Sequence, residues 1–437
     1  MVREKQVMSR LSILFLTNRF PYPIVDGQSR RTYNILKGLS RNHDVVLLSL
    51  FDESAPVELH ALEHIRQWCA AVELFPIPPK TLSVSMVVRF LRSLASMDPY
   101  TIWRHRSDPF LKRVEVLAKG GRFDLVHCDI LPVVYAIRDL GGIYRAFTDH
   151  DVSFLKAERM ADTSRNPLLK LLHRLEAIKL KRLEGRIFQQ VDLGVAVSDV
   201  DRNMLSRLYP KANLCVVENG VDVGEFEPSH GRGGEGSLVW VGGFDNYPNR
   251  EGIYFFFDEV YSFLKRRVPQ VQIDVIGGGV TPTLLDYAAA DSSIQIHGYV
   301  NDPVPYIQRA AVFIVPILSG SGTRLKLLEA MATGKAIVTT TIGCEGIEGE
   351  HGVHYLVADD PGLFAESVGI LLSDTALREK LGKNARQLAR ERYDWKKLCE
   401  KMEVIYQTAC GKGRVGREAV DEVIAQRLSV PKSNASF

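Results

Sequence analysis

The residues with the clearest capacity for chemistry lie in the segment GSGTRLKLLEAMA, residues 320–332. Its glycines precede a helical pattern, and we expect Ser321 or Thr323 to cap that helix. Arg324 and Lys326 would lie in the first turn, where each cation opposes the helix dipole at a cost of roughly a few tenths of a kcal/mol. A bound phosphate or diphosphate reverses that sign. The alternative is a solvated basic turn packed on a carboxylate. The predicted anion site consists of Gly320, Ser321, Gly322, Thr323, Arg324 and Lys326.

Glu329 adds a carboxylate to the same predicted helix, at the border of its apolar face. A carboxylate in that position needs a partner. Lys326, three residues earlier, could supply one. The alternative partner is a pair of ligand hydroxyls, as a ribose presents, and both interpretations stay open.

Three ionisable residues, Asp149, His150 and Asp151, directly follow an apolar run that predicts a strand. Side chains at the carboxyl end of a strand are well placed for proton transfer or for contact with a sugar hydroxyl, and we expect His150 to face a ligand. Two other interpretations remain. Asp151 or Ser153 could cap the following helix, or the D-x-D spacing could hold a divalent cation.

A single glycine, Gly27, stands with Gln28, Ser29 and Arg30 between the first predicted strand and the first predicted helix. Glycine permits close approach of the backbone to a ligand, so Gly27 is a further candidate for ligand binding. The turn has no G-x-G-x-x-G pattern, which argues against a standard NAD or FAD site.

Basic and aromatic residues alternate over residues 79–114, and residues 168–188 combine leucines with lysines and arginines. Such segments suit an anionic membrane surface or a lipid-linked substrate. Core helices whose arginines extend their charged ends to solvent give the same pattern. The sequence leaves these two interpretations open.

Alternating strands and helices must position these residues. Apolar runs that alternate with helical patterns predict parallel sheets covered on both faces. The expected helices include residues 29–39, 250–265 and 323–333. The expected strands are residues 11–17, 44–50, 72–77, 123–127, 144–148, 193–197 and 214–218 in the first half, and 238–241, 272–276, 294–297, 312–315 and 336–340 in the second.

These patterns predict two doubly wound α/β domains. We expect an N-terminal domain over residues 1–226, a Gly-rich linker over 227–237 and a C-terminal domain over 238–392. A final helix over 393–410 would pack back toward the N-terminal domain, and a flexible tail would follow over 411–437. Ligands of such sheets bind outside the carboxyl ends of the strands, so the cleft between the halves is the expected site.

Composition excludes several classes of protein. The 437 residues are 46% hydrophobic and 24% charged, as in soluble globular proteins. The net charge of +3 is too balanced for a dedicated nucleic-acid binder. The six cysteines show no C-x-x-C spacing, which indicates buried thiols in a reducing compartment. No apolar stretch approaches the roughly 20 residues of a spanning helix, and no signal peptide is recognisable, so we expect a cytoplasmic protein.

In their order along the chain, the motifs resemble those of the GT-B glycosyltransferases, and within them family 4. The resemblance covers roughly residues 11–406, and the segment GSGTRLKLLEAMATGKAIVTT is its specific part. The other matches are the Gly27 loop, FDLVH (123–127), VAVSD (195–199), VENGVD (217–222), WVGGFDNYPN (240–249), VIGGG (275–279), IHGYV (296–300) and YDW (393–395).

The resemblance implies an enzyme with no cofactor that binds a nucleotide-diphosphate sugar mainly on the C-terminal domain. It would transfer the sugar with retention, without a metal, to an acceptor on the N-terminal side. Glu329 matches the second glutamate of the family's E-x7-E motif, which usually meets the ribose. The chain departs from the family at two positions. The first glutamate falls at Ser321, and the usual arginine after the first C-domain strand is Gly243.

The implied catalytic residues are His150, near the sugar and acceptor, with Arg324 and Lys326 on the diphosphate. Retaining members are thought to use front-face attack, in which the leaving diphosphate takes the acceptor proton, so the protein mainly stabilises developing charge. The implied donor-binding residues are Gly27, Gly243, Asn249, Gly320, Ser321, Gly322, Thr323, Arg324, Lys326 and Glu329.

Relatives with this segment often build surface polysaccharides on lipid carriers. We therefore expect a glycan or lipid-linked acceptor, and a protein that works in the cytoplasm or peripherally on the inner face of the plasma membrane. Three alternatives remain. They are a metal-dependent GT-A transferase that uses Asp149 and Asp151, another GT-B activity such as an epimerase or a phosphorylase, and a non-catalytic GT-B scaffold.

Overall fold

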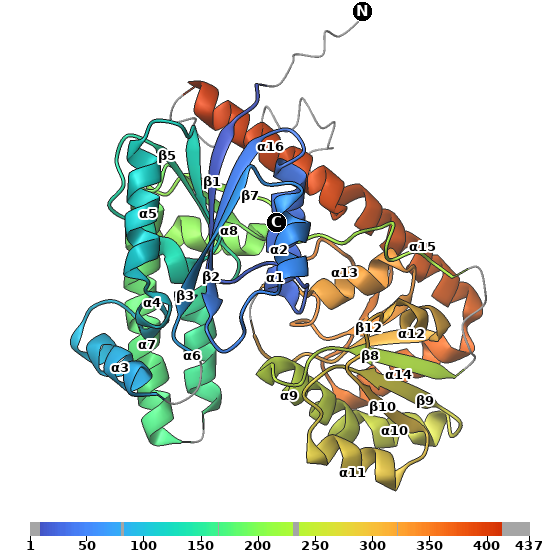
Figure 1. Ribbon diagram of the computed structural model, residues 1–437. Coiled ribbons are helices and arrows are strands. Elements are labelled where there is room, and N and C mark those ends of the chain that lie inside the picture. The colour runs from blue at the N-terminus through green and yellow to red at the C-terminus, as the bar shows by residue number, and fades with distance from the viewer. Residues whose placement is uncertain (1–8, 80–82, 165, 230–235, 321, 413–437) are drawn as a thin grey trace, which may run out of the picture. The chain divides into compact units, whose positions relative to one another are not determined.

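The computed structural model describes residues 9–79, 83–164, 166–229, 236–320 and 322–412 of the chain. Within this part, the chain forms two compact units, residues 9–218 with 396–412 and residues 219–395. Each unit is built on one parallel sheet with helices between the strands (Figure 1). Ser321 and most of the predicted tail lie outside the described residues.

The first unit contains a seven-stranded sheet in the order β3-β2-β1-β4-β5-β6-β7, and all of its described pairs are parallel. The order reverses between β1 and β4, and such a reversal is where ligands bind in open α/β sheets. The strands are β1 (Ser12–Thr17), β2 (Asp44–Asp52), β3 (Ala71–Ile77), β4 (Leu125–Cys128), β5 (Tyr144–Asp149), β6 (Leu193–Ala196) and β7 (Leu214–Val216).

Helices of the first unit fill the connections between these strands. The last helix, α16, returns from the far end of the chain to this unit. The helices are α1 (Gly27–Leu39), α2 (Leu59–Arg66), α3 (Val84–Ala95), α4 (Tyr100–His105), α5 (Asp108–Lys119), the 3-10 helix η1 (Leu131–Ala136), α6 (Ser153–Thr163), α7 (Pro167–Gln190), α8 (Asp199–Leu208) and α16 (Trp395–Lys412).

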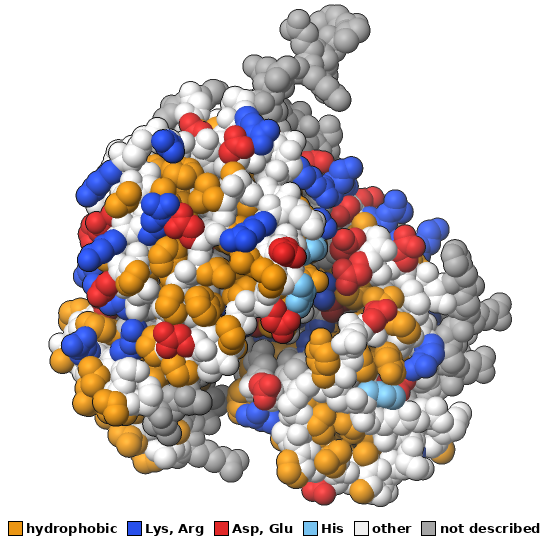
Figure 2. Space-filling model, viewed as in Figure 1, with side chains coloured by type: hydrophobic (Ala, Val, Ile, Leu, Met, Phe, Trp, Pro, Cys, Tyr) orange, Lys and Arg blue, Asp and Glu red, His pale blue; other side chains and the backbone are white. Residues whose placement is uncertain are grey.

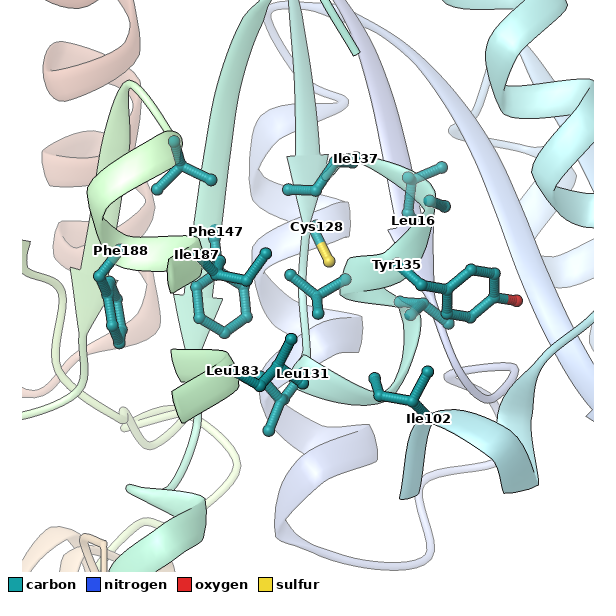
Figure 3. Packing of buried hydrophobic residues seen from close by; sticks show 14 of the residues in the cluster. Leu16, Ile102, Cys128, Leu131, Tyr135, Ile137, Phe147, Leu183, Ile187 and Phe188 are labelled. Atoms are coloured by element: carbon teal, nitrogen blue, oxygen red, sulfur yellow. The ribbon is translucent and has the colours of Figure 1, made fainter. Parts of the chain in front are cut away.

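The core of the first unit follows from the alternation of side chains along its strands. Leu16, Cys128 and Phe147 point to one face, where they pack against α4, η1 and α7 (Figure 3). On the opposite face, the ring of Phe15 lies 4.5 Å from that of His127, centroid to centroid. His127 in turn contacts Tyr406 of α16. The sheet is therefore buried on both faces, which explains its almost continuous apolar strands.

The second unit contains a six-stranded parallel sheet in the order β10-β9-β8-β11-β12-β13, with the reversal between β8 and β11. Its strands are β8 (Ser237–Val241), β9 (Gln272–Ile276), β10 (Ile294–Gly298), β11 (Val312–Val315), β12 (Ala336–Thr339) and β13 (Leu356–Val357). Its helices are α9 (Tyr247–Phe255), the π-helix η2 (Phe256–Val260), α10 (Tyr261–Arg267), α11 (Pro282–Ala290), α12 (Val304–Arg309), α13 (Leu325–Ala332), α14 (Pro361–Ser373) and α15 (Thr375–Arg392).

Each predicted strand is present, with ends that move by at most two residues. The two-residue strand β13 was not predicted. The predicted helix over residues 250–265 is divided by the π-helical turn η2. No helix in the described part of the chain combines the length and the apolar composition needed to cross a membrane.

The chain leaves the first unit after Glu218 and returns to it after Trp395. The sequence predicts the end of the first domain at residue 226, but Val221 and Phe226 are buried in the core of the second unit. Val221 also pairs with the end of that unit, because its N–H donates to Tyr393 O at 2.8 Å and its carbonyl accepts from Trp395 N at 3.2 Å. The described parts of the predicted linker, residues 227–229 and 236–237, belong to the second unit.

Candidate functional site

Predicted site residues of the second unit gather where its strand order reverses. Gly243 follows β8, Gly277 follows β9, and residues 316–324 connect β11 to α13. The carboxyl ends of parallel strands share one edge of the sheet, so these loops lie at the edge where ligands of such folds bind.

Lys326 is at the centre of this group. Its Nζ donates a hydrogen bond of 2.7 Å to Asn249 Oδ1, and it lies 4.5 Å from the centroid of the buried Trp240 ring. Asn249 Nδ2 donates to Gly243 O at 2.9 Å. The structure therefore brings together three of the predicted donor-binding residues, Lys326, Asn249 and Gly243.

The ammonium group of Lys326 is poorly solvated. Burial lowers its pKa to about 7, the nearby charge of Arg324 adds to that effect, and Glu329 opposes it. An anion bound beside Lys326 would favour its charged form. The site thus holds a cation whose charge depends on the presence of a negatively charged ligand.

The start of α13 differs from the prediction. The helix begins at Leu325 with Arg324 as its N-cap, and no side chain caps it. Arg324 turns back onto its own loop, where its guanidinium donates to Gly322 O at 2.9 Å and to Ser319 O at 3.3 Å. The prediction that Thr323 caps the helix and that Arg324 lies in its first turn is therefore wrong. The positive φ of 79° at Gly322 bends the chain before the helix.

A buried hydroxyl lies in the same loop. Thr323 is 9% exposed, and its Oγ1 has no hydrogen-bond partner among the described residues. Buried polar groups are normally hydrogen-bonded. This hydroxyl lies near the uncapped start of α13 and near Lys326, whose pKa is lowered. Together these groups make the loop suitable for binding an oxyanion.

Two glycines allow the loops to approach one another. A Cβ at Gly277 would lie 1.9 Å from Gly242 O, and a Cβ at Gly242 would lie 2.4 Å from Lys326 Nζ. At Gly243, by contrast, a Cβ would meet nothing within 4 Å. Glycine is therefore required at residue 277, where the close atom is backbone, whereas the close atom at Gly242 is the end of a flexible lysine side chain. The open space at Gly243 leaves room for a ligand.

Glu329 is half-buried on α13, one turn after Lys326. Its charge supports protonation of Lys326, which agrees with the interpretation that the two side chains are partners. The alternative contact, with ribose hydroxyls, stays a prediction. Gly320 adopts a φ of 104° in the loop before the helix.

In the first unit, His150 contacts a residue that the sequence analysis missed. His150 lies just after β5, and its Nε2 is 3.3 Å from Asp129 Oδ1. Asp129 directly follows β4, at the reversal point of the first sheet. Its position after the predicted strand FDLVH could have identified it, since side chains at that edge reach the ligand site.

Asp129 holds a buried group of side chains in position. Its Oδ2 accepts a hydrogen bond of 2.5 Å from Thr32 Oγ1, and its Oδ1 lies 3.3 Å from His127 Nε2. His127 Nδ1 is hydrogen-bonded to the hydroxyl of Tyr406 on α16. Burial alone would raise the pKa of Asp129, but His150 and His127 hold it below its usual value. Asp129 is therefore a charged anchor for His150.

Asp149 and Asp151 do not suit the alternatives proposed from the sequence. The N-cap of α6 is Val152, so neither Asp151 nor Ser153 caps that helix. Burial and the carboxylate of Glu184 raise the pKa of Asp149 well above its usual value, which disfavours a metal ligand. Asp151 Oδ2 lies 3.6 Å from Lys156 Nζ instead. In the described ranges, no three His, Cys, Asp or Glu side chains are grouped to hold a metal.

The Gly27 turn is part of a helix start. Gly27 is the first residue of α1, two residues before the predicted start. Asp26 caps the helix by accepting from Ser29 N at 2.9 Å, and Ser29 Oγ accepts from Asp26 N in return. The neighbouring Arg31 is fully buried and donates to the carbonyls of the chain just after β7. Neither Asp26 nor Arg31 was expected from the sequence.

Several cations of the basic and aromatic segment 79–114 make internal contacts. Arg89 donates to the carbonyls of Trp103 and Arg106. Arg104 donates to Pro78 O at 2.9 Å, and Arg113 pairs with Glu73. These contacts agree with the interpretation of the segment as packed helices.

Comparison with known proteins identifies family relationships for both units. Residues 25–225 match the family described as Glycosyltransferase Family 4. Residues 235–374 match the family described as Glycosyl transferases group 1. Together these matches include all of the predicted site residues in both units.

Two curated relatives align with part of the chain. A phosphatidyl-myo-inositol mannosyltransferase of Mycolicibacterium smegmatis is 28% identical over 50% of this chain and 58% of that protein. An uncharacterized 44.6 kDa protein in the cps region of Klebsiella pneumoniae is 25% identical over 37% of this chain and 44% of that protein. The chain thus spans about half the length of the curated relatives it matches.

Solved structures share the fold over nearly the whole chain. The sucrose-phosphate synthase of Thermosynechococcus elongatus superposes with a TM-score of 0.69 at 17% identity, covering 92% of this chain and 100% of that chain. Anabaena HepE in complex with UDP-glucose superposes with a TM-score of 0.61 at 14% identity, covering 90% of this chain and 98% of that chain. The fold is therefore GT-B, with two Rossmann-like domains, and the GT-A alternative is wrong.

Proposed function

The chain belongs to glycosyltransferase family 4, and from that premise we propose that it transfers a sugar from a nucleotide-diphosphate donor to a glycan or lipid-linked acceptor. We propose that the anomeric configuration is retained and that no metal or other cofactor takes part. A solved neighbour of the same fold binds UDP-glucose, which supports a nucleotide sugar as the donor.

The observation that carries this proposal is the environment of Lys326. A partly buried ammonium with a pKa of about 7, the unpartnered hydroxyl of Thr323 and an uncapped helix start lie in one loop region. Each of these groups is stabilised by an oxyanion. A diphosphate would supply oxygens to all of them, and Arg324 lies one residue away on the same loop.

In the proposed reaction, the bond between the anomeric carbon and the diphosphate oxygen breaks, and a bond to the acceptor oxygen forms on the same face. The acceptor proton passes to the leaving diphosphate. Lys326, Arg324 and the amides of residues 320–323 would stabilise the negative charge that develops there. His150, held by Asp129, would orient the sugar or the acceptor hydroxyl, and Glu329 would meet the ribose.

We propose that the acceptor belongs to the synthesis of a cell-surface glycan and that the protein works beside a membrane. The Klebsiella relative comes from a cps region, and the mannosyltransferase relative is named for a phosphatidyl-inositol. Both relatives support a polysaccharide or lipid-linked acceptor for this chain as well.

Thermal unfolding of the purified protein tests donor binding. The melting temperature would be measured with UDP-, GDP-, ADP-, CDP- and dTDP-sugars, each with and without EDTA. A ligand at about 100 times its Kd adds roughly 2.7 kcal/mol, which is a shift of about 5–10 °C for a domain of this size. One nucleotide class should give that shift with EDTA present. A shift abolished by EDTA would contradict the metal-independent reaction.

A scaffold without catalysis is the second candidate, because Ser321 and Gly243 depart from the family motif. Glu329→Ala separates the two functions. A transferase should lose donor affinity or turnover in this variant while its melting temperature without ligand stays unchanged. No shift with any nucleotide in the unmodified protein would favour the scaffold.

A further inference from the structure

Helix α3 exposes a row of large aliphatic side chains. Val84, Val87, Val88, Leu91 and Leu94 recur at helical spacing, and their exposed fractions range from 40% to 82%. Soluble proteins rarely expose contiguous apolar surface of this kind without a binding partner. Ser93 is the only buried residue of this helix, so α3 contributes little to the core.

The first half of α7 exposes a second row. Leu168, Leu169, Leu171, Leu175 and Ile178 are between 41% and 64% exposed. The buried residues of α7 begin at Ala177, near the middle of the helix. The first half of this helix therefore presents leucines to solvent, although the second half packs in the core.

The two rows lie on neighbouring elements. Lys179 of α7 is hydrogen-bonded to Ser93 O of α3. Glu176 of α7 accepts from Tyr100 N at 2.9 Å and from Thr101 N at 3.2 Å, at the start of α4. Over α3, hydrophobic side chains gather with Lys and Arg beside them at the lower left of Figure 2. We call these ten side chains of α3 and α7 the aliphatic surface.

The charges that α3 and the first part of α7 contribute are almost all positive, whereas the neighbouring α6 adds the acidic Glu158 and Asp162 beside the basic Lys156 and Arg159. Residues 83–97 contain Arg89 and Arg92 and no acidic residue, and residues 167–183 contain Glu176 as their single acid. Both carboxylate oxygens of Glu176 accept backbone hydrogen bonds from the start of α4, so this carboxylate points toward α4. Cations around exposed aliphatic side chains complement anionic lipid headgroups above an acyl interior.

We propose that the aliphatic surface docks the protein on an anionic lipid bilayer, with its aliphatic side chains in the interface and the exposed Arg92 and Arg174 on the headgroups. Arg89, Arg104 and Arg113 are not among the docking groups, because their guanidinium groups make internal contacts. The proposal rests on the proposed function in one respect: membrane binding would bring the protein to a lipid-linked acceptor. The binding itself does not depend on transferase activity.

Co-sedimentation of the full chain with vesicles tests the proposal. Vesicles of phosphatidylcholine with about one third phosphatidylglycerol should retain the protein, and pure phosphatidylcholine vesicles should not. Replacing one leucine on each helix, as Leu91→Glu with Leu171→Glu, should lower the partition coefficient roughly tenfold or more. Leu285→Glu on α11, which is 56% exposed in the second unit, is the matched control and should bind like the unmodified protein.

Two results would overturn the proposal. One is failure of the unmodified protein to bind anionic vesicles. The other is an oligomer in solution that dissociates in the Leu91→Glu, Leu171→Glu variant, which would make the aliphatic surface an interface between copies. The nucleotide-induced shift in melting temperature should be the same in this variant, so failure of membrane binding and failure of the proposed function are distinguishable.

Discussion

At the scale of single residues, Lys326 decides how the donor site responds to pH. Its pKa of about 7 without ligand leaves the amine mostly neutral at pH 8. A diphosphate beside it would raise that pKa, because opposite charge favours the protonated form. We therefore expect nucleotide-diphosphate binding at pH 8 to take up roughly one proton and to weaken up to about tenfold per pH unit above 7.

Isothermal titration calorimetry in buffers of different ionisation enthalpy measures this uptake. Lys326→Met should bind the nucleotide more weakly and abolish the proton uptake. A buffer-independent enthalpy in the unmodified protein would show that Lys326 is not beside the diphosphate.

The contact between Asp129 and His150 leads to a second prediction at this scale. Asp129→Asn removes the charge that lies 3.3 Å from His150 Nε2 while keeping the shape of the side chain. We expect turnover to fall roughly 100-fold, as for other groups that position an acid or base, with little change in nucleotide affinity. Asp151→Asn is the matched control, since Asp151 lies beside Lys156, and it should retain activity. Equal losses in the two variants would contradict the role given to Asp129.

The sequence was enough to identify some of the site residues but not others. Lys326 was identified because two cations in the first turn of a helix need an anion. Only Lys326 lies in that turn, since the helix begins at Leu325, and the bound anion stays a prediction. Asp129 was missed because a single carboxylate after a strand has no distinctive spacing. Its importance comes from Thr32 and His127, which only the folded chain brings to it.

At the scale of elements, the close approach of the loops after β8 and β9 depends on glycine. A Cβ at Gly277 would lie 1.9 Å from Gly242 O, which no side-chain movement can relieve. We expect Gly277→Ala to cost several kcal/mol of stability, at the upper end for single substitutions, and to weaken nucleotide binding. Gly243→Ala should leave the melting temperature unchanged, because its Cβ would meet nothing within 4 Å. Thermal unfolding of both variants gives the comparison.

The packing of β5 against α7 leads to a pH-dependent prediction. Burial raises the pKa of Glu184 to about 8, so the folded state binds a proton that the unfolded state releases between about pH 4.5 and 8. Stability must therefore fall as pH rises through that range. Glu184→Gln should weaken this dependence, and the part that remains should come from Asp149, whose pKa burial also raises. Chemical denaturation at pH 6 and pH 8 measures the difference, and an equal effect at both would contradict the raised pKa.

The strands were predictable because both sheets are buried on both faces, which makes each strand almost continuously apolar. The short β13 carries too few residues for any periodicity, and the π-helical turn η2 has the same apolar pattern as the helix around it. Boundaries set by long-range pairs, such as Val221 with Tyr393, leave no local signal in the sequence.

At the scale of the whole molecule, α16 completes the first unit from the other end of the chain. Met402, Ile405 and Tyr406 are buried, and a Cβ at Gly38 of α1 would overlap Cys399 of α16. We expect a fragment of residues 219–395 to fold and to bind the nucleotide by itself. A fragment of residues 1–218 should instead expose apolar surface and aggregate. Circular dichroism melts and calorimetry of the two fragments check this, and a stable 1–218 fragment would contradict it.

Because the chain leaves the first unit after Glu218 and returns to it after Trp395, the parts of this unit are synthesised at different times. The ribosome delivers β1 to β7 early, but the helix that covers one face of their sheet emerges only after residues 219–395. Domains generally fold as units while the chain is being made. The second domain can therefore reach its native state before the first, and the unfinished sheet must wait for about 180 residues, at roughly 5–20 residues per second. During that interval the uncovered sheet exposes apolar surface and is a substrate for a chaperone that shields such surface.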